Sequence, residues 1–156
     1  MRSIAIASAI ARVACGANPT PIAFAEVYLA LQNGTVEAQE NPLTTIEAKK
    51  FYEVQKNVML TGHIVDGVVT QIAPHVWNKL SDADKQVFIE VTQEAAARGT
   101  AKVVKREAEL VDEFKAKGIT IVTVNRQSFI DAVLKNFTPE SLGYERKDYD
   151  RIVALK

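Results

Sequence analysis

The residues best suited to bind a small molecule stand together in the segment Gln39-Glu40-Asn41-Pro42. The sequence predicts a short strand over residues 35–39 and a helix after Pro42, so this segment lies where a strand gives way to a helix. Ligands of open α/β sheets bind beyond the carboxyl ends of strands, and an amide there can donate to a carboxylate or hydroxyl. Alternatively, Asn41 only shapes the turn before Pro42, and the residues by themselves leave both interpretations open.

No combination of side chains indicates a catalytic or metal site. Cys15 is the single cysteine, it lies in an alanine-rich stretch, and no nucleophile motif occurs around it or elsewhere. We therefore expect Cys15 to be a small buried hydrophobic residue. His63 and Asp66 would point to opposite faces of a strand beginning at residue 64, and His75 follows much later, so no metal site is expected. Glycine-rich nucleotide motifs are also absent from the sequence, and no cofactor is predicted.

The charge balance argues against a nucleic-acid partner. The chain has 156 residues, and its 19 basic and 19 acidic side chains cancel. The basic residues Lys102, Lys105 and Arg106 are followed at helical spacing by acidic ones, beginning with Glu107, which predicts a solvated, ion-paired helix face. Any anion must therefore be held by local groups rather than by a general field.

The elements that would position the candidate segment alternate between strands and helices. This order predicts an α/β fold with a largely parallel sheet. One helix exceeds the needs of a compact lobe, and we expect it to span or brace two lobes. In chain order, the predicted elements are a helix over 24–32 ended by Asn33-Gly34, a strand over 35–39, a helix capped by Thr44 or Thr45 and running to 54, strands over 58–60 and 64–72, a short helix from Pro74, a long helix capped by Ser81 and ended by Gly118, a strand over 119–124, a helix over 128–136 and a helical tail from Pro139.

Five linked segments carry a resemblance to a known family. The chain resembles the dicarboxylate-binding proteins of TRAP (tripartite ATP-independent periplasmic) transporters, a family that includes sialic-acid-binding proteins. The segments are Gly16-Ala17-Asn18-Pro19-Thr20-Pro21, residues 24–32 (FAEVYLALQ), residues 36–43 (VEAQENPL), residues 48–56 (AKKFYEVQK) and Leu60-Thr61-Gly62-His63.

The resemblance implies a periplasmic binding protein and not an enzyme. Two α/β lobes of such proteins close on an organic acid, such as a C4-dicarboxylate, sialic acid or a related carboxylate, and deliver it to membrane subunits. Residues 1–156 would form the C-terminal part of such a protein: roughly one lobe with the long bracing helix and the C-terminal helices, with most of the N-terminal lobe absent. The alternative is a truncated fragment that binds nothing alone and self-associates through an exposed lobe interface.

The resemblance also implies roles for individual residues. Asn41, with Glu40 beside it, would hydrogen-bond the ligand, and Phe24 would supply an apolar or stacking wall. Arg2 is the nearest match to the family's arginine, whose planar fork would grip the ligand carboxylate. The segment from Arg2 to Cys15 is open to two interpretations, a secretion signal or a strand or helix that enters the fold.

Overall fold

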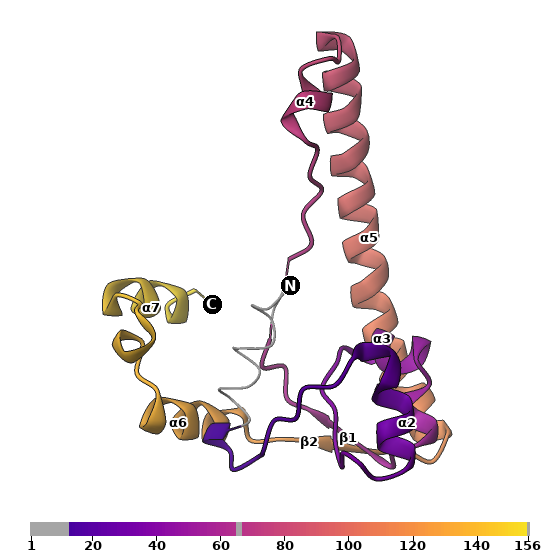
Figure 1. Ribbon diagram of the computed structural model, residues 1–156, viewed down its shortest axis with the longest axis vertical. Helices are drawn as coiled ribbons and strands as arrows, with labels where there is room; N and C mark the ends of the chain where they lie inside the picture. Colours follow the sequence, from indigo (N-terminus) through magenta and orange to yellow (C-terminus); the bar gives the residue numbers. More distant parts are fainter. Residues whose placement is uncertain (1–12, 65–66, 156) are drawn as a thin grey trace. The chain divides into compact units, whose positions relative to one another are not determined.

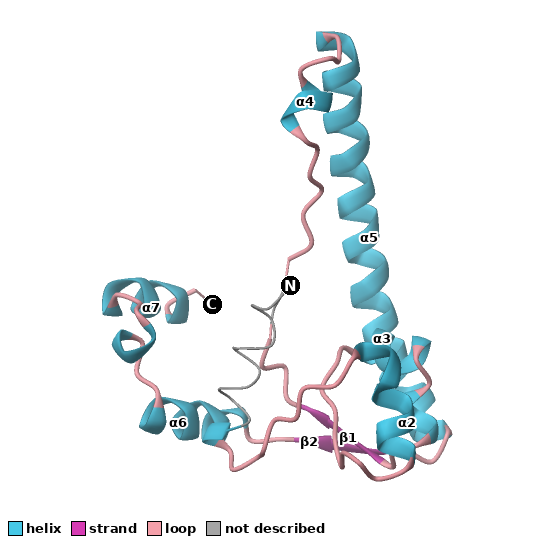
Figure 2. Cartoon of the chain, in the orientation of Figure 1, coloured by secondary structure: helices cyan, strands magenta, loops and turns pink. Residues whose placement is uncertain are grey.

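The computed structural model describes residues 13–64 and 67–155, and it is mainly helical (Figures 1 and 2). The described chain divides into two compact units. The larger unit comprises residues 25–58 and 67–122, and the smaller comprises residues 13–24, 59–64 and 123–155.

Helices α2 (Val27–Gln32) and α5 (Asp82–Ala116) of the larger unit end where local sequence signals place their ends. Helix α2 ends at Asn33, whose backbone N–H donates to the carbonyl of Leu29 at 3.0 Å. Gly34 follows with φ of +75°. Glycine adopts this left-handed conformation without steric cost, so the predicted stop signal is confirmed. The helical elements are η1 (Phe24–Glu26, which begins at the last residue of the smaller unit), α2 (Val27–Gln32), α3 (Leu43–Ala48), η2 (Phe51–Glu53), α4 (Pro74–Trp77) and α5 (Asp82–Ala116).

Helix α5 is the long helix that the sequence predicts. It has 35 residues, which corresponds to about 50 Å of helix axis. Ser81 caps it, because its hydroxyl accepts from the N–H of Asp84 at 3.1 Å. At the other end the helix stops at Lys117 and Gly118, where φ is +83°. Helix α4 lies beside the first turns of α5 (Figure 1), with the rings of Trp77 and Phe88 6.0 Å apart.

The core of the larger unit surrounds the C-terminal part of α5. Leu110 and Phe114 of α5 and Phe51 of η2 are at most 1% exposed. The Tyr52 ring packs at 5.5 Å from the ring of Phe114. The other buried apolar residues of this unit are Ala30, Leu31, Leu43, Ile46, Val58 and Ile119.

Strands β1 (Asn57–Leu60) and β2 (Thr120–Thr123) form a two-stranded sheet. The N–H of Thr120 donates to the carbonyl of Lys56 at 2.9 Å. The two strands therefore begin side by side and run parallel, and α4 and α5 lie in the long connection between them.

The smaller unit contributes the C-terminal helices. Asn125 caps the first of them by accepting from the N–H groups of Gln127 and Ser128. The guanidinium of Arg126 donates to the Gly62 carbonyl at 2.7 Å, which ties this helix to the segment that follows β1. The elements are α6 (Arg126–Asn136), η3 (Glu140–Leu142) and α7 (Arg146–Val153), as the sequence predicts.

Two of the predicted strands do not form. Residues 35–39 follow α2 as irregular backbone, with the N–H of Val36 bound to the carbonyl of Ala30 at 3.2 Å instead of to a neighbouring strand. The described residues of the segment 64–72 form a loop in which Val68 and Val69 are exposed. Their β-branched composition suits a strand, but β propensity depends on a partner strand that the described residues do not provide.

Two further expectations are wrong in detail. The helix predicted to run to residue 54 divides into α3 and η2, because Lys50 adopts a left-handed conformation with φ of 55°. That turn directs Phe51 into the core. Cys15 is exposed rather than buried, since it lies in a short turn outside the core of either unit.

Candidate ligand-binding site

The four residues predicted to contact a ligand have different positions in the structure. Glu40 and Asn41 are adjacent in the larger unit, directly before α3, and both are half-buried. Phe24 is the first residue of η1, belongs to the smaller unit and is 50% exposed. Arg2 lies outside the described residues.

A chain of three side-chain amides fixes the side chain of Asn41. Its Nδ2 donates to Oε1 of Gln39 at 2.6 Å, and Nε2 of Gln39 donates to Oε1 of Gln55 at 3.2 Å. All of these groups are partly buried, so the bonds are sheltered from competing water. Sequence reasoning missed Gln55, because a separation of 16 residues across an irregular turn leaves no periodic signal.

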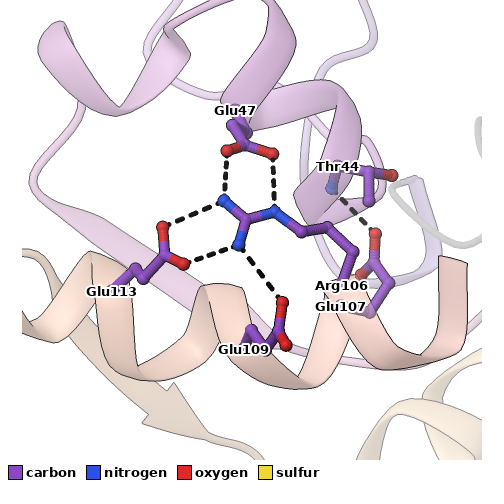
Figure 3. Close-up of polar contacts among 6 residues, drawn as sticks. All are labelled: Thr44, Glu47, Arg106, Glu107, Glu109 and Glu113. Carbon is purple, nitrogen blue, oxygen red and sulfur yellow. Dashed lines mark hydrogen bonds and ion pairs between the residues drawn. The ribbon is translucent and has the colours of Figure 1, made fainter. Parts of the chain in front are cut away.

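The backbone that follows Asn41 is held by a residue of α5. Pro42 occupies the N-cap position of α3 and provides no side-chain hydrogen bond there. Instead, the carboxylate of Glu107 accepts from the N–H of Leu43 at 3.1 Å and from the N–H of Thr44 at 2.8 Å. Figure 3 shows the second of these bonds. The prediction that Thr44 or Thr45 caps this helix is therefore wrong, because the cap is supplied from a distant part of the chain.

Arg106, next to Glu107, binds the other end of α3 (Figure 3). Its guanidinium makes a bidentate pair with Glu47 of α3, with Nε donating to Oε2 at 3.1 Å. It also donates to both oxygens of Glu113 at 2.6 and 2.9 Å, and to Glu109 at 3.4 Å. The ion pairing predicted for this part of α5 forms around Arg106 and between Lys105 and Glu109. The expectation of a solvated face is wrong for Arg106 and Glu107, which are half-buried against α3.

The same contacts shift the acidity of the paired groups. Hydrogen bonds from Arg106 lower the pKa of Glu47 and of Glu113 below their usual range. The two carboxylates in turn raise the pKa of Arg106, Glu47 contributing the larger effect. All three groups therefore stay charged at neutral pH.

The side chains at the turn before α3 can form hydrogen bonds with a ligand. Asn41 brings an amide and Glu40 a carboxylate to a turn whose backbone is fixed on the side that leads into α3. His63 is bound to the Thr61 hydroxyl at 2.6 Å. Across residues 13–64 and 67–155, no three His, Cys, Asp or Glu side chains gather in a way that could hold a metal ion. Such a turn suits recognition of a polar solute.

Comparison with known proteins decides the family. The model of the family described as bacterial extracellular solute-binding protein, family 7, matches residues 4–138. The chain belongs to this family. The resemblance predicted from the five sequence segments is thereby confirmed.

Curated relatives of this family are similar over most of the chain. The sialic acid-binding periplasmic protein of Vibrio cholerae is 47% identical over 118 residues, which are 76% of this chain and 37% of that protein. The 2,3-diketo-L-gulonate-binding periplasmic protein of Escherichia coli is 34% identical over 119 residues, 76% of this chain and 36% of the relative. The chain thus spans little more than a third of the length of these relatives.

Solved structures agree on the fold. A TRAP periplasmic solute-binding protein from Polaromonas, bound to D-erythronate, has a TM-score of 0.84 and 36% identity, and the match covers 96% of this chain and 50% of that one. Another from Roseobacter denitrificans, with bound 3-deoxy-D-manno-oct-2-ulosonic acid, has a TM-score of 0.81 and 34% identity, with 94% and 49% covered. The predicted fold class, part of a solute-binding protein of this type, is confirmed. Helices within the described ranges are too short or too polar to cross a membrane.

Proposed function

We propose that this chain provides the carboxylate-binding part of a periplasmic TRAP solute-binding protein that captures an organic acid for uptake. The family match over residues 4–138 supports this proposal most strongly. The chain acts in binding and transport rather than as an enzyme, and its partners are the membrane subunits of the transporter. The relatives' names support the periplasmic location.

The ligands named for the relatives indicate a solute class. Sialic acid, 2,3-diketo-L-gulonate, D-erythronate and 3-deoxy-D-manno-oct-2-ulosonic acid all carry a carboxylate, and all carry several oxygen groups. The side-chain amide of Asn41 can hydrogen-bond either the carboxylate or a hydroxyl of such a ligand, and the carboxylate of Glu40 can accept from hydroxyls. Phe24 contributes apolar surface, and Arg2 pairs with the carboxylate.

A titration tests this function directly. Isothermal calorimetry with sialic acid, D-erythronate and succinate should give saturable heat for at least one acid, and no heat for the neutral sugar mannose. Asn41→Ala should weaken that affinity about tenfold, the usual cost of one lost hydrogen bond to a charged group. Gln86→Ala, an exposed amide on α5, is the matched control and should bind as the parent chain does.

A second candidate follows from the exposed apolar residues of α5. Val87, Val91, Val103 and Val104 are 57%, 59%, 52% and 66% exposed. Val87 and Val91 lie one turn apart on α5, and Val103 and Val104 lie about three turns further along the helix. Exposed apolar surface promotes association, and in this candidate the chain self-associates and binds no acid alone. Analytical ultracentrifugation in reducing buffer, combined with the calorimetry above, distinguishes acid capture from self-association. A monomer that binds an acid supports capture. An oligomer that gives no heat with any acid of the panel contradicts capture and supports self-association.

A further inference from the structure

The first turn of helix α3 is capped by a residue from outside the helix. The helix has six residues, and Leu43 begins it two residues after Asn41. The N–H groups of a first turn have no partner within the helix and need an outside acceptor. Here both bonds to the N–H groups of Leu43 and Thr44 end on the single carboxylate of Glu107, which lies 64 and 63 residues further along the chain.

The contact with Glu107 is one of two points that fasten α3 to α5. Glu107 holds the N-terminal end of α3, and the neighbouring Arg106 holds Glu47 near its C-terminal end. Leu43 and Ile46 of α3 are buried, 9% and 5% exposed. With both ends tied and the apolar face buried, α3 has a fixed orientation on α5, and the turn before it inherits that orientation.

The side chain of Asn41 is also held through Gln39 and Gln55. Its direction therefore depends on two supports: the amide chain on one side and the Glu107 cap on the other. Without Glu107 the Pro42 carbonyl would still accept from the N–H groups of Thr45 and Ile46, but the N–H groups of Leu43 and Thr44 would lose the acceptor that ties them to α5. A hydrogen bond to a ligand needs its donor held to within a fraction of an ångström.

We propose that Glu107 is a positioning residue for ligand capture: by capping α3 it sets the place from which Asn41 hydrogen-bonds the solute. The inference rests on the proposed function of Asn41, and it adds a residue of α5 that does not touch the ligand. Loss of this cap weakens acid binding while the buried core of the unit stays intact.

Three variants separate positioning from a general effect on the fold. Glu107→Gln keeps the size of the side chain but replaces one of the two acceptor oxygens by an NH₂ group, so in the observed geometry one of the two bonds is lost. Glu107→Asp keeps the carboxylate on a shorter stem and serves as the conservative rescue. Glu94→Gln removes the same charge from an exposed part of α5, where Glu94 pairs with Arg98 of the same helix at 3.3 Å, and is the matched control.

Two readouts are recorded on the whole chain. Nuclear magnetic resonance follows the backbone amides of Leu43 and Thr44 and the side-chain NH₂ of Asn41, and calorimetry measures affinity for sialic acid and D-erythronate. Glu107→Gln should shift all three sets of signals and weaken binding about tenfold, with Glu107→Asp between it and the parent. The control should change neither readout.

Unchanged Asn41 signals in Glu107→Gln, or an affinity equal to that of Glu94→Gln, would overturn the inference. If Glu107→Gln does not fold, Glu107→Asp carries the same comparison with smaller shifts. If the parent chain binds neither acid, the proposed function fails. The signals of Asn41 then decide the positioning role alone: movement in the Glu107 variant but not in the control upholds it, and no movement refutes it.

Discussion

At the scale of single residues, Arg106 is the most heavily paired side chain near the candidate site. It lies between Glu47 and Glu113, so removal of its charge affects two carboxylates at once. Because Arg106 lowers their pKa, both carboxylates are easier to ionise in the folded chain than in the unfolded chain. The stabilisation is complete above the usual value of 4.5 and disappears as the pH falls through the lower, folded-state pKa.

Arg106→Gln should therefore be less stable than the parent chain at pH 7, and the difference should shrink as the pH falls below about 4.5, the ordinary value for these carboxylates. Urea denaturation at a series of pH values measures it. The control Arg98→Gln breaks an exposed pair with Glu94 and should show little difference at any pH. If the difference in the free energy of unfolding between Arg106→Gln and the parent stays constant down to pH 2, the explanation through these carboxylates is wrong.

The sequence places Asn41 and its neighbour Glu40 at the turn before Pro42, and their role at a ligand stays a prediction. It could not anticipate the hydrogen bond from Gln39 to Gln55 or the cap that Glu107 provides for α3. Both are contacts made across irregular backbone or across more than sixty residues, as in the bond from Leu43 to Glu107. Hydrophobic periodicity and capping signals report only on neighbours within a few turns of the chain. For this reason the sequence predicted Thr44 or Thr45 as the cap of α3, and that prediction is wrong.

At the scale of elements, the break between α3 and η2 depends on one strained residue. Lys50 has φ of 55°, the one positive value that a residue other than glycine adopts in the described chain. Such a conformation disfavours a side chain with a Cβ atom, whereas glycine accepts it. The sequence predicted a continuous helix here because Lys50 is a good helix former and gives no stop signal.

Lys50→Gly should raise the free energy of unfolding by about 0.5 kcal/mol, the relieved strain less the extra entropy of the unfolded glycine. The neighbouring Lys49 is the control, since its φ of −99° is ordinary. Lys49→Gly should lower stability by about 0.5–1 kcal/mol. Thermal denaturation followed by circular dichroism measures both, and equal effects of the two substitutions would rule out strain at Lys50.

At the scale of the whole molecule, the buried core of the described residues is concentrated where the end of α5 meets α3 and η2. Sequence predicted most helices and both observed strands, because their periodicity and caps are local. It predicted too many strands, since residues 35–39 and 64–72 have strand-like composition but no partner strand in the described chain. The family itself was readable from linked motifs, which record common ancestry rather than local physics.

Phe114 tests this location of the core, because it is 0% exposed. Phe114→Ala should cost about 3–5 kcal/mol through lost burial and the cavity that remains. Val104→Ala lies on the same helix at a residue that is 66% exposed, and should change stability by less than about 0.5 kcal/mol. Urea midpoints measure both, and similar midpoints would place the core elsewhere.

The uneven burial of α5 also bears on how the helix moves. Residues 93–105 are exposed on every side, with Gly99 near their middle, whereas Leu110 and Phe114 are buried. A short helical stretch without tertiary contacts is marginal in water, and a central glycine weakens it further. We therefore expect this stretch to open in local excursions that leave the core closed, and the last turns of α5 to come apart only when the unit unfolds. Amide hydrogen exchange should then be faster around Gly99 than around Leu110 and Phe114, although all three residues belong to one continuous helix.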